Sequence, residues 1–383
     1  MANSKTMAAR EKAARLNKIN KMLNFDYTLL FIVIFILAFG FVMLYSTSAY
    51  AATIKTANSS YYLKKQAMAA GIGFVGMAII TKIDYRFWKK FVIPIYLIVF
   101  FLCVAVIFVG TTLNESSRWL MIGGISVQPS EFAKVAVILF VSYVISISPR
   151  SQRDFKTTIK TLGFVFPIFA VVAYNNLSTA IIILGIACVM VFIASPRIKE
   201  FFVLLLLCVA AVIFYISIAG YRAGRIDAWL HPGDYISGTG FQTLQGLYAI
   251  GSGGLFGKGL GESLQKFIVP EAQNDMIFTI ICEELGIFGA ICVILMYILL
   301  LYRLIYIANH AKDLFGSYIC IGIMTHIALQ VILNIAVVTN SIPNTGVTLP
   351  FISYGGTSVM VLLCEIGLAL SVSKKMEIEQ PDE

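Results

Sequence analysis

The sequence predicts an all-α membrane protein with ten transmembrane helices. Of the 383 residues, 59% are hydrophobic and only 13% are charged, whereas soluble domains carry about 25% charged residues. The apolar residues also form continuous runs of about 20 residues, the length that an α-helix needs to cross a bilayer. The strands of a membrane β-barrel would alternate in polarity instead. A soluble fold is excluded because a chain of this length could not bury so much apolar surface.

The ten predicted spans follow one another along the chain. They are Tyr27–Thr47, Gln66–Thr81, Phe91–Gly110, Phe132–Ser148, Thr161–Tyr174, Leu177–Ser195, Phe201–Ala219, Met276–Leu300, Ser317–Val338 and Pro350–Ser373. The fifth and sixth runs are short and are joined only by Asn175 and Asn176, which favours a helical hairpin.

The distribution of basic residues predicts the orientation. With the N-terminus inside, the inner segments hold 20 Lys and Arg and the outer segments hold 8, as the positive-inside rule requires. We therefore expect a basic cytoplasmic tail over 1–25, a membrane domain over 26–375 and a short cytoplasmic tail over 376–383. The first span is longer than the apolar region of a signal peptide, about 7–15 residues, and should stay uncleaved. The net charge of +9 then reflects topology and anionic lipid, and no nucleic-acid partner is expected.

The longest connection, 220–275, is predicted on the outer face between spans seven and eight. Its apolar residues argue against disorder, and Gln242–Ile250 has the pattern of a short amphipathic helix at the membrane interface. Six glycines follow within the eleven residues Gly251–Gly261, here called the glycine-rich loop. Because glycine permits positive φ, exposed N–H groups in this loop could cradle a phosphate. A flexible hinge explains the same composition equally well.

Charged residues also mark the second outer segment, 111–131. Arg118 can bind an anionic headgroup or snorkel to the interface. Glu131 and Lys134 lie one turn apart at the start of the fourth span, so they share a helix face and can pair. A charge within a span costs about 2.5–3.5 kcal/mol, and two together indicate a polar cavity. A purely structural ion pair is the alternative.

The remaining polar features lie around the eighth and tenth spans. Asp275 sits where the long loop becomes a helix, and it is either the N-cap or, if Asn274 serves as the cap, a free carboxylate. Glu283 and Glu284 are adjacent and cannot both face lipid, so both need protein or water around them. The segment 340–358 breaks the helix with Pro and Gly at membrane depth, which is tolerated only beside protein or a wet cavity. These features converge on a polar cavity that opens outward, and they fit either an enzyme acting on an anionic lipid or a transporter.

In order and spacing, these motifs resemble those of the SEDS family (FtsW, RodA and SpoVE), over about 26–375. The motifs are Arg118-Trp119, Gln128-Pro-Ser-Glu131-x-x-Lys134, Gln245 with the glycine-rich loop, Pro270-Glu-x5-Ile277-Phe around Asp275, Glu283-Glu-Leu-Gly286 and Pro350-Phe-Ile-Ser-Tyr-Gly-Gly356. The stretch Gly259–Lys266 looks more like the FtsW/SpoVE branch than RodA. The family usually has His-Thr before its aspartate, where this chain has Gln273-Asn274.

The resemblance implies a peptidoglycan glycosyltransferase that polymerises lipid II at the outer face, for division, sporulation or shape. Asp275 matches the family's catalytic aspartate. An α-linked pyrophosphate donor that yields a β-1,4 product requires inversion, hence one general base and stabilisation of the leaving group. A transporter of lipid-linked precursors is the alternative function, and a scaffold that recruits a partner is a third.

The resemblance also implies substrate contacts and partners. The expected substrate-binding residues are Arg118, Glu131, Lys134, Gln245, Lys258, Asn344 and Ser353. A divalent cation, Mg²⁺ or Mn²⁺, is expected by resemblance alone, with no ligands identified. The expected partners are a class B penicillin-binding protein, which is a single-pass transpeptidase, and other divisome or elongation proteins.

Overall fold

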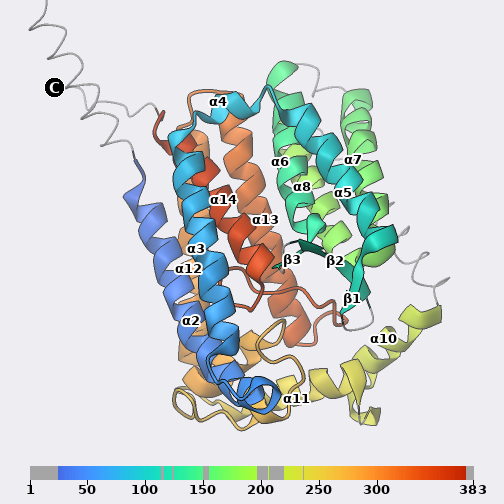
Figure 1. Cartoon of the computed structure of the whole chain (residues 1–383), viewed down its shortest axis with the longest axis vertical. Coiled ribbons are helices and arrows are strands. Elements are labelled where there is room, and N and C mark those ends of the chain that lie inside the picture. Colours follow the sequence, from blue (N-terminus) through green and yellow to red (C-terminus); the bar gives the residue numbers. More distant parts are fainter. Residues whose placement is uncertain are drawn as a thin grey trace, which may run out of the picture.

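The computed structural model describes residues 25–113, 116–122, 125–149, 155–195, 206, 220–235 and 237–376, and it shows a helical bundle (Figure 1). Nine helices in this described part are long and apolar enough to cross a membrane. They are α2 (Tyr27–Thr56), α3 (Tyr61–Lys82), α5 (Val92–Val109), α6 (Pro129–Ile147), α7 (Phe155–Asn175), α8 (Leu177–Ala194), α12 (Ile277–Asn309), α13 (Leu314–Val338) and α14 (Gly356–Ser373). They confirm the predicted all-α membrane fold. The predicted seventh span lies outside the described residues, apart from Leu206.

The shorter elements lie between the spans. They are α4 (Tyr85–Trp88), α10 (Gly220–Leu230), η2 (Pro232–Asp234), α11 (Gly238–Ser252), η3 (Gln265–Phe267) and the strands β1 (Thr111–Leu113), β2 (Ser116–Ile122) and β3 (Ile125–Val127). The strands form an antiparallel sheet in the order β1-β2-β3, which hydropathy did not predict. The expected amphipathic helix is present as α11, and the expected hairpin as α7 and α8.

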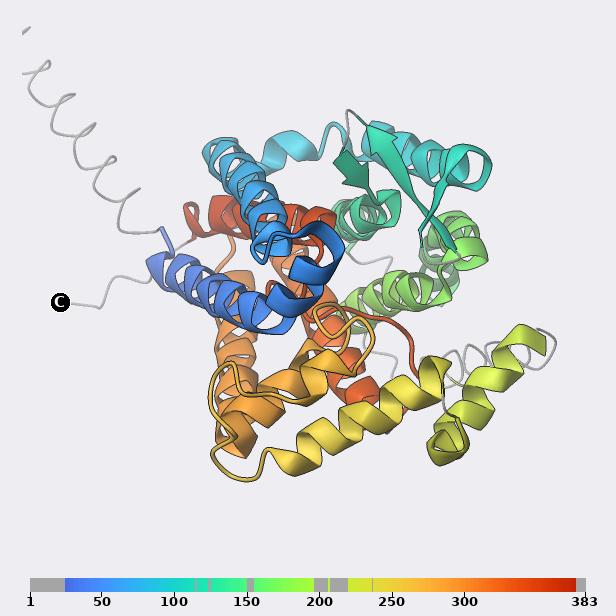
Figure 2. The same ribbon diagram turned by 60° about the horizontal axis from the view of Figure 1, so that its bottom comes forward.

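The bundle has an interior group of helices and a lipid-facing shell. Most residues of α6, α13 and α14 are buried. By contrast, α2 and α5 expose large apolar side chains such as Phe31 and Phe108, as expected for helices in contact with lipid. The end of the bundle at the bottom of Figure 1, where α11 lies across α12 (Figure 2), is called the Asp275 face below.

An ion-pair cluster closes the opposite end of the bundle. The carboxylate of Asp313, the N-cap of α13, accepts hydrogen bonds from the Tyr85 hydroxyl at 2.7 Å, from Arg86 Nε at 2.7 Å and from the Gly316 N–H at 2.9 Å. Burial raises the pKa of Asp313, but these three donors outweigh burial and hold the pKa below its usual 3.8. The cluster fixes α4 against the start of α13.

Candidate functional site

Asp275 lies at the end of the bundle, immediately before α12. The helix begins at Ile277, and its N-cap is Met276, which makes no side-chain cap. The interpretation of Asp275 as an N-cap is therefore wrong. Its side chain is close to buried, and the residue is only 9% exposed. Asp275 is thus a buried carboxylate at the end of the bundle that does not serve as the cap of α12.

An amide from a distant segment contacts the Asp275 carboxylate, and a second amide holds the first. Gln242 of α11 places Nε2 3.4 Å from Oδ1, and its Oε1 accepts a hydrogen bond from Asn344 Nδ2 at 3.0 Å. Gly346 approaches from the same segment as Asn344: a Cβ at this position would lie 3.9 Å from Asp275 Oδ2. Gln242 thus connects the expected site residue Asn344 to Asp275. Gln245, the expected substrate contact on α11, is half-buried one turn further along that helix.

The backbone of Asp275 is held by a residue that the sequence analysis missed. Asn334 of α13 is fully buried, and its Nδ2 donates to the Asp275 carbonyl at 2.7 Å and to the Val347 carbonyl at 2.8 Å. A polar residue inside an apolar span is itself a signal of function, and this rule would have selected Asn334. One amide therefore ties together α13, the start of α12 and the segment before α14.

The segment before α14 is fixed by its own hydrogen bonds. Ser353 is buried, and its hydroxyl accepts from the Leu349 N–H at 2.8 Å. The next N–H, of Tyr354, donates to the Gln273 carbonyl at 2.9 Å. Ser353, an expected substrate contact, thus shapes the backbone beside the residues that precede Asp275.

Part of the glycine-rich loop is hydrogen-bonded to α12. In that part, the loop is neither an open phosphate-binding site nor a flexible hinge. Helix α12 is broken at Gly286, where φ is 69°. The loop donates its N–H groups at Lys258 and Gly259 to the carbonyls of Glu283 and Glu284, at 2.9 and 3.0 Å. Buried carbonyls need such partners at a helix break, so these two N–H groups are occupied.

Glu283 anchors the same loop with its side chain. The carboxylate is fully buried and accepts from Lys258 Nζ at 2.6 Å, from the Ser263 hydroxyl and from the N–H groups of Leu264 and Gln265 at 3.3 and 3.2 Å. This confirms that the acidic pair at 283 and 284 requires protein around it. Lys258, an expected substrate contact, is an ion-pair partner whose side chain remains 32% exposed.

Two further buried ion pairs lie within the spans. Lys134 Nζ is 2.9 Å from Glu131, with the two side chains 0% and 8% exposed, which confirms the predicted pairing. His326 of α13 and Glu365 of α14 are both fully buried, 2.8 Å apart. His326 is also close enough to Glu131 to interact electrostatically. The pairs join α6, α13 and α14 beneath the site.

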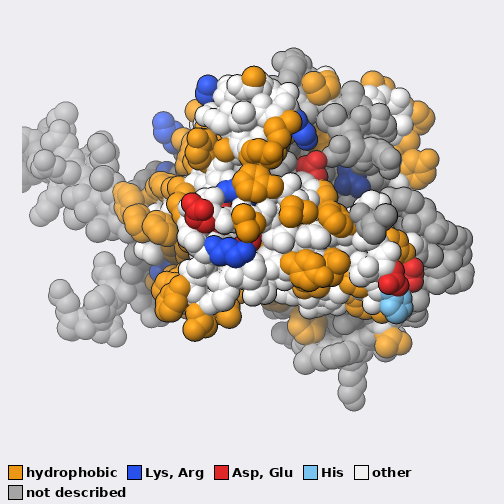
Figure 3. Space-filling view, turned by 90° about the horizontal axis from the view of Figure 1, so that it is seen from below, with side chains coloured by type: hydrophobic (Ala, Val, Ile, Leu, Met, Phe, Trp, Pro, Cys, Tyr) orange, Lys and Arg blue, Asp and Glu red, His pale blue; other side chains and the backbone are white. Residues whose placement is uncertain are grey.

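Figure 3 shows the Asp275 face, where hydrophobic side chains cover much of the surface and charged side chains gather between them. Exposed apolar side chains of the glycine-rich loop and the residues after it include Leu255, Phe256, Leu260, Leu264 and Phe267. A groove of about 560 Å³ between α2, α3 and this loop has Lys266 at its edge.

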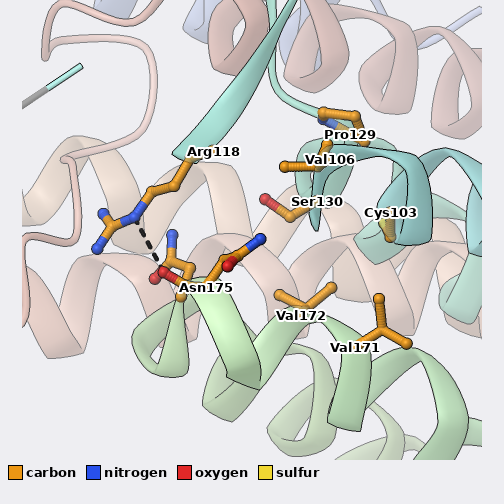
Figure 4. A pocket seen from close by; sticks show the side chains of 9 residues that line it. Cys103, Val106, Arg118, Pro129, Ser130, Val171, Val172 and Asn175 are labelled. Carbon is orange, nitrogen blue, oxygen red and sulfur yellow. Dashed lines mark hydrogen bonds between the residues drawn. The ribbon is translucent and has the colours of Figure 1, made fainter. Parts of the chain in front are cut away.

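Arg118 lies on β2, next to a small cavity (Figure 4). Its Nε donates to the Asn175 carbonyl at 3.3 Å. The cavity holds about 20 Å³, enough for one water and no more. The neighbouring helix α8 reaches the site, since the Ser178 hydroxyl donates to the Thr345 carbonyl at 2.7 Å. Arg118 therefore contacts the end of α7, and the first turn of α8, which follows directly, contacts the segment that holds Asn344.

The donor set around Asp275 bears on the expected divalent cation. Within the described residues, no group of three or more His, Cys, Asp and Glu side chains is placed to hold a metal ion. Mg²⁺ is commonly held by one or two carboxylates together with substrate phosphates and water. The described residues do not fit a cage made by protein alone, so a cation here would be held mainly by the phosphates of the substrate and by water.

The bundle of apolar helices defines a multi-pass membrane protein. The chain belongs to the SEDS family: the FtsW, RodA and SpoVE family model, described as cell cycle protein, matches residues 27–378. Stage V sporulation protein E of Bacillus subtilis is 41% identical over 91% of this chain and 97% of that protein. A probable peptidoglycan glycosyltransferase FtsW of Geobacter sp. is 36% identical over 92% and 97%.

Solved structures share the fold. A chain from a peptidoglycan synthase complex, described as coordinating polymerization and crosslinking, is 25% identical over 91% of this chain and 97% of that chain, with a TM-score of 0.77. RodA of Thermus thermophilus is 24% identical over 93% and 98%, with a TM-score of 0.68. At this identity the RodA comparison bears on the fold alone.

Proposed function

We propose that this protein is a peptidoglycan glycosyltransferase that polymerises lipid II by inverting transfer, with Asp275 as general base. The observation that carries the proposal is the position of the Asp275 carboxylate between Gln242 and the segment that holds Asn344. The relatives of this chain include proteins named as probable peptidoglycan glycosyltransferases. Orientation with both termini in the cytoplasm puts this carboxylate at the outer face.

The reaction needs a single displacement. The acceptor 4-hydroxyl attacks the anomeric carbon of the donor, the carbon–oxygen bond to undecaprenyl pyrophosphate breaks, and the hydroxyl proton passes to Asp275. Inversion requires no covalent nucleophile, so one carboxylate suffices. Gln242, itself held by Asn344, orients that carboxylate.

The leaving pyrophosphate needs positive charge. Arg118 and Lys258 are the expected basic contacts, and Lys258 reaches the surface while its amine stays on Glu283. A divalent cation held by the pyrophosphate and water would neutralise the leaving group and leave the Asp275 carboxylate to act as the base. Glu131 and Lys134 would shape the cavity from below, and the groove near Lys266 suits the isoprenoid tail.

The test is polymerisation of purified lipid II by the full chain, with and without a candidate class B penicillin-binding protein. Asp275→Asn should abolish polymer while leaving thermal unfolding unchanged. Glu262→Gln removes an exposed carboxylate from the same face and should stay active. Full activity of Asp275→Asn would refute the assignment. Lipid flipping in proteoliposomes without any polymer would favour the transporter instead.

A further inference from the structure

Three tyrosines form a cluster on the Asp275 face that the proposed mechanism does not use. Tyr61 and Tyr62 begin α3, and Tyr354 lies just before α14. The Tyr61 and Tyr62 rings are 5.3 Å apart, and those of Tyr62 and Tyr354 are 5.0 Å apart, both edge to face. Each residue is partly exposed. We call these three residues the tyrosine platform.

The tyrosine platform is held rigidly from below. Gln66, one turn after Tyr62, is buried; its Nε2 donates to the Ser353 carbonyl at 3.0 Å, and its Oε1 accepts from the Gly355 N–H at 3.1 Å. One amide therefore brackets Tyr354 on both sides. A tyrosine that only anchors a protein at the membrane interface needs an apolar ring and a solvated hydroxyl. It does not need a buried amide to fix its backbone, so the hydrogen bonds of Gln66 indicate a more specific role.

The platform is also joined to the catalytic segment. The Tyr354 N–H donates to the carbonyl of Gln273, which is buried two residues before Asp275. Tyr354 is thus hydrogen-bonded to the segment that leads into Asp275, so the platform has a fixed position relative to that segment. Preorganisation of this kind lowers the entropic cost of binding.

The surroundings of the platform are basic. Lys64 and Lys65 are exposed beside it, and Lys65 Nζ lies 4.5 Å from the centre of the Tyr61 ring. Residues 48–66 contain three lysines and no acidic residue. Burial, together with Tyr61 and Tyr62, raises the pKa of Tyr354 to about 12, so its hydroxyl remains a proton donor at neutral pH. A ligand here would present apolar ring faces, hydroxyls and carboxylates.

We propose that the tyrosine platform is a binding subsite for the sugar rings of the glycan chain being extended, with Lys64 and Lys65 contacting the carboxylates of its peptides. Tyrosine combines a flat apolar face with a polar hydroxyl, which matches a pyranose ring with axial C–H groups and equatorial hydroxyls. This inference rests on the proposed function and adds a second contact point, which would keep the chain bound between transfers.

Binding of a soluble β-1,4-linked N-acetylglucosamine hexamer to the purified full chain tests the subsite without turnover. Tyr62→Leu and Tyr61→Leu should each weaken binding about 3- to 10-fold, the range measured for single aromatic contacts. Tyr62→Phe should retain most of the affinity. Tyr248→Leu, at an exposed tyrosine of α11, is the matched control and should bind as the wild type does.

Two further measurements complete the test. Lys64→Gln with Lys65→Gln should weaken binding of a soluble peptide-bearing glycan fragment but not of the hexamer. In polymerisation, Tyr62→Leu should give shorter glycan strands than Tyr248→Leu does. Hexamer binding that is equal in wild type, Tyr62→Leu and Tyr61→Leu, with unfolding unchanged, overturns the subsite. Binding without polymerisation in the wild type overturns only the proposed function.

Discussion

Asn334 should be the residue whose loss most directly disturbs Asp275. Asn334→Leu preserves side-chain volume but removes the donor shared by the Asp275 and Val347 carbonyls. Both carbonyls are then unsatisfied in an interior where the asparagine is 0% exposed. Each such group costs about 1–3 kcal/mol, so we expect the free energy of unfolding to fall by about 2–6 kcal/mol.

The assay is unfolding by denaturant in detergent, together with the rate of lipid II polymerisation. Activity should fall about 100-fold, as a displacement of about 1 Å in a catalytic group can cause. Gln330→Met, one turn away on α13, is the control, because Gln330 is buried and its Oε1 has no hydrogen-bond partner. Its stability should be unchanged or higher. A loss below about 1 kcal/mol in Asn334→Leu, or an equal loss in both variants, would refute the reasoning.

Three other perturbations test the surrounding structure. Lys134→Met should lower the free energy of unfolding by about 3–5 kcal/mol by leaving Glu131 charged and unpaired, and adding Glu131→Gln should restore most of it in the same denaturation assay. Gly257→Ala should open the glycine-rich loop to protease, since its Cβ would lie 2.2 Å from a backbone oxygen of α12. Gly261→Ala, also at positive φ but with nothing within 4 Å, should be cut no faster than about wild-type rates, and equal cleavage of the two variants would contradict this. Asp313 has a lowered pKa, so its stabilising effect is present above its unfolded value of 3.8 and is lost as pH falls below it. Asp313→Asn should therefore make the melting temperature depend less on pH in thermal melts recorded across that range.

Hydropathy located the spans well but not their ends. The predicted first span stops at Thr47, whereas α2 continues to Thr56, because hydropathy reports the thickness of the apolar layer and not the end of hydrogen bonding. The small sheet over Thr111–Val127 was missed for a related reason. A short polar connection carries no periodic apolar signal, and its pairing depends on neighbours brought close by α5 and α6.

The candidate site was predicted in part. The motif spacing selected Asp275 and Asn344, which the fold brings together through Gln242. It did not select Gln242 or Asn334, since these residues act through contacts with segments more than 30 positions away. Motif spacing also could not decide whether the glycine-rich loop binds phosphate or acts as a hinge. Two of its N–H groups bond to carbonyls of α12 near the helix break at Gly286, and this pairing appears only in the tertiary structure.

The sequence alone determined that the chain spans a membrane, which family it resembles and which carboxylate matches that family's motif. These properties depend on composition, on charge bias and on the local order of motifs, all of which are written along the chain. Only the tertiary structure decided which polar groups satisfy one another. Inside an apolar bundle a buried donor or acceptor without a partner is costly, and the way in which the helices pack decides which groups can pair. The clamp of Asn334 on Asp275, and of Gln66 on the tyrosine platform, follows from that packing.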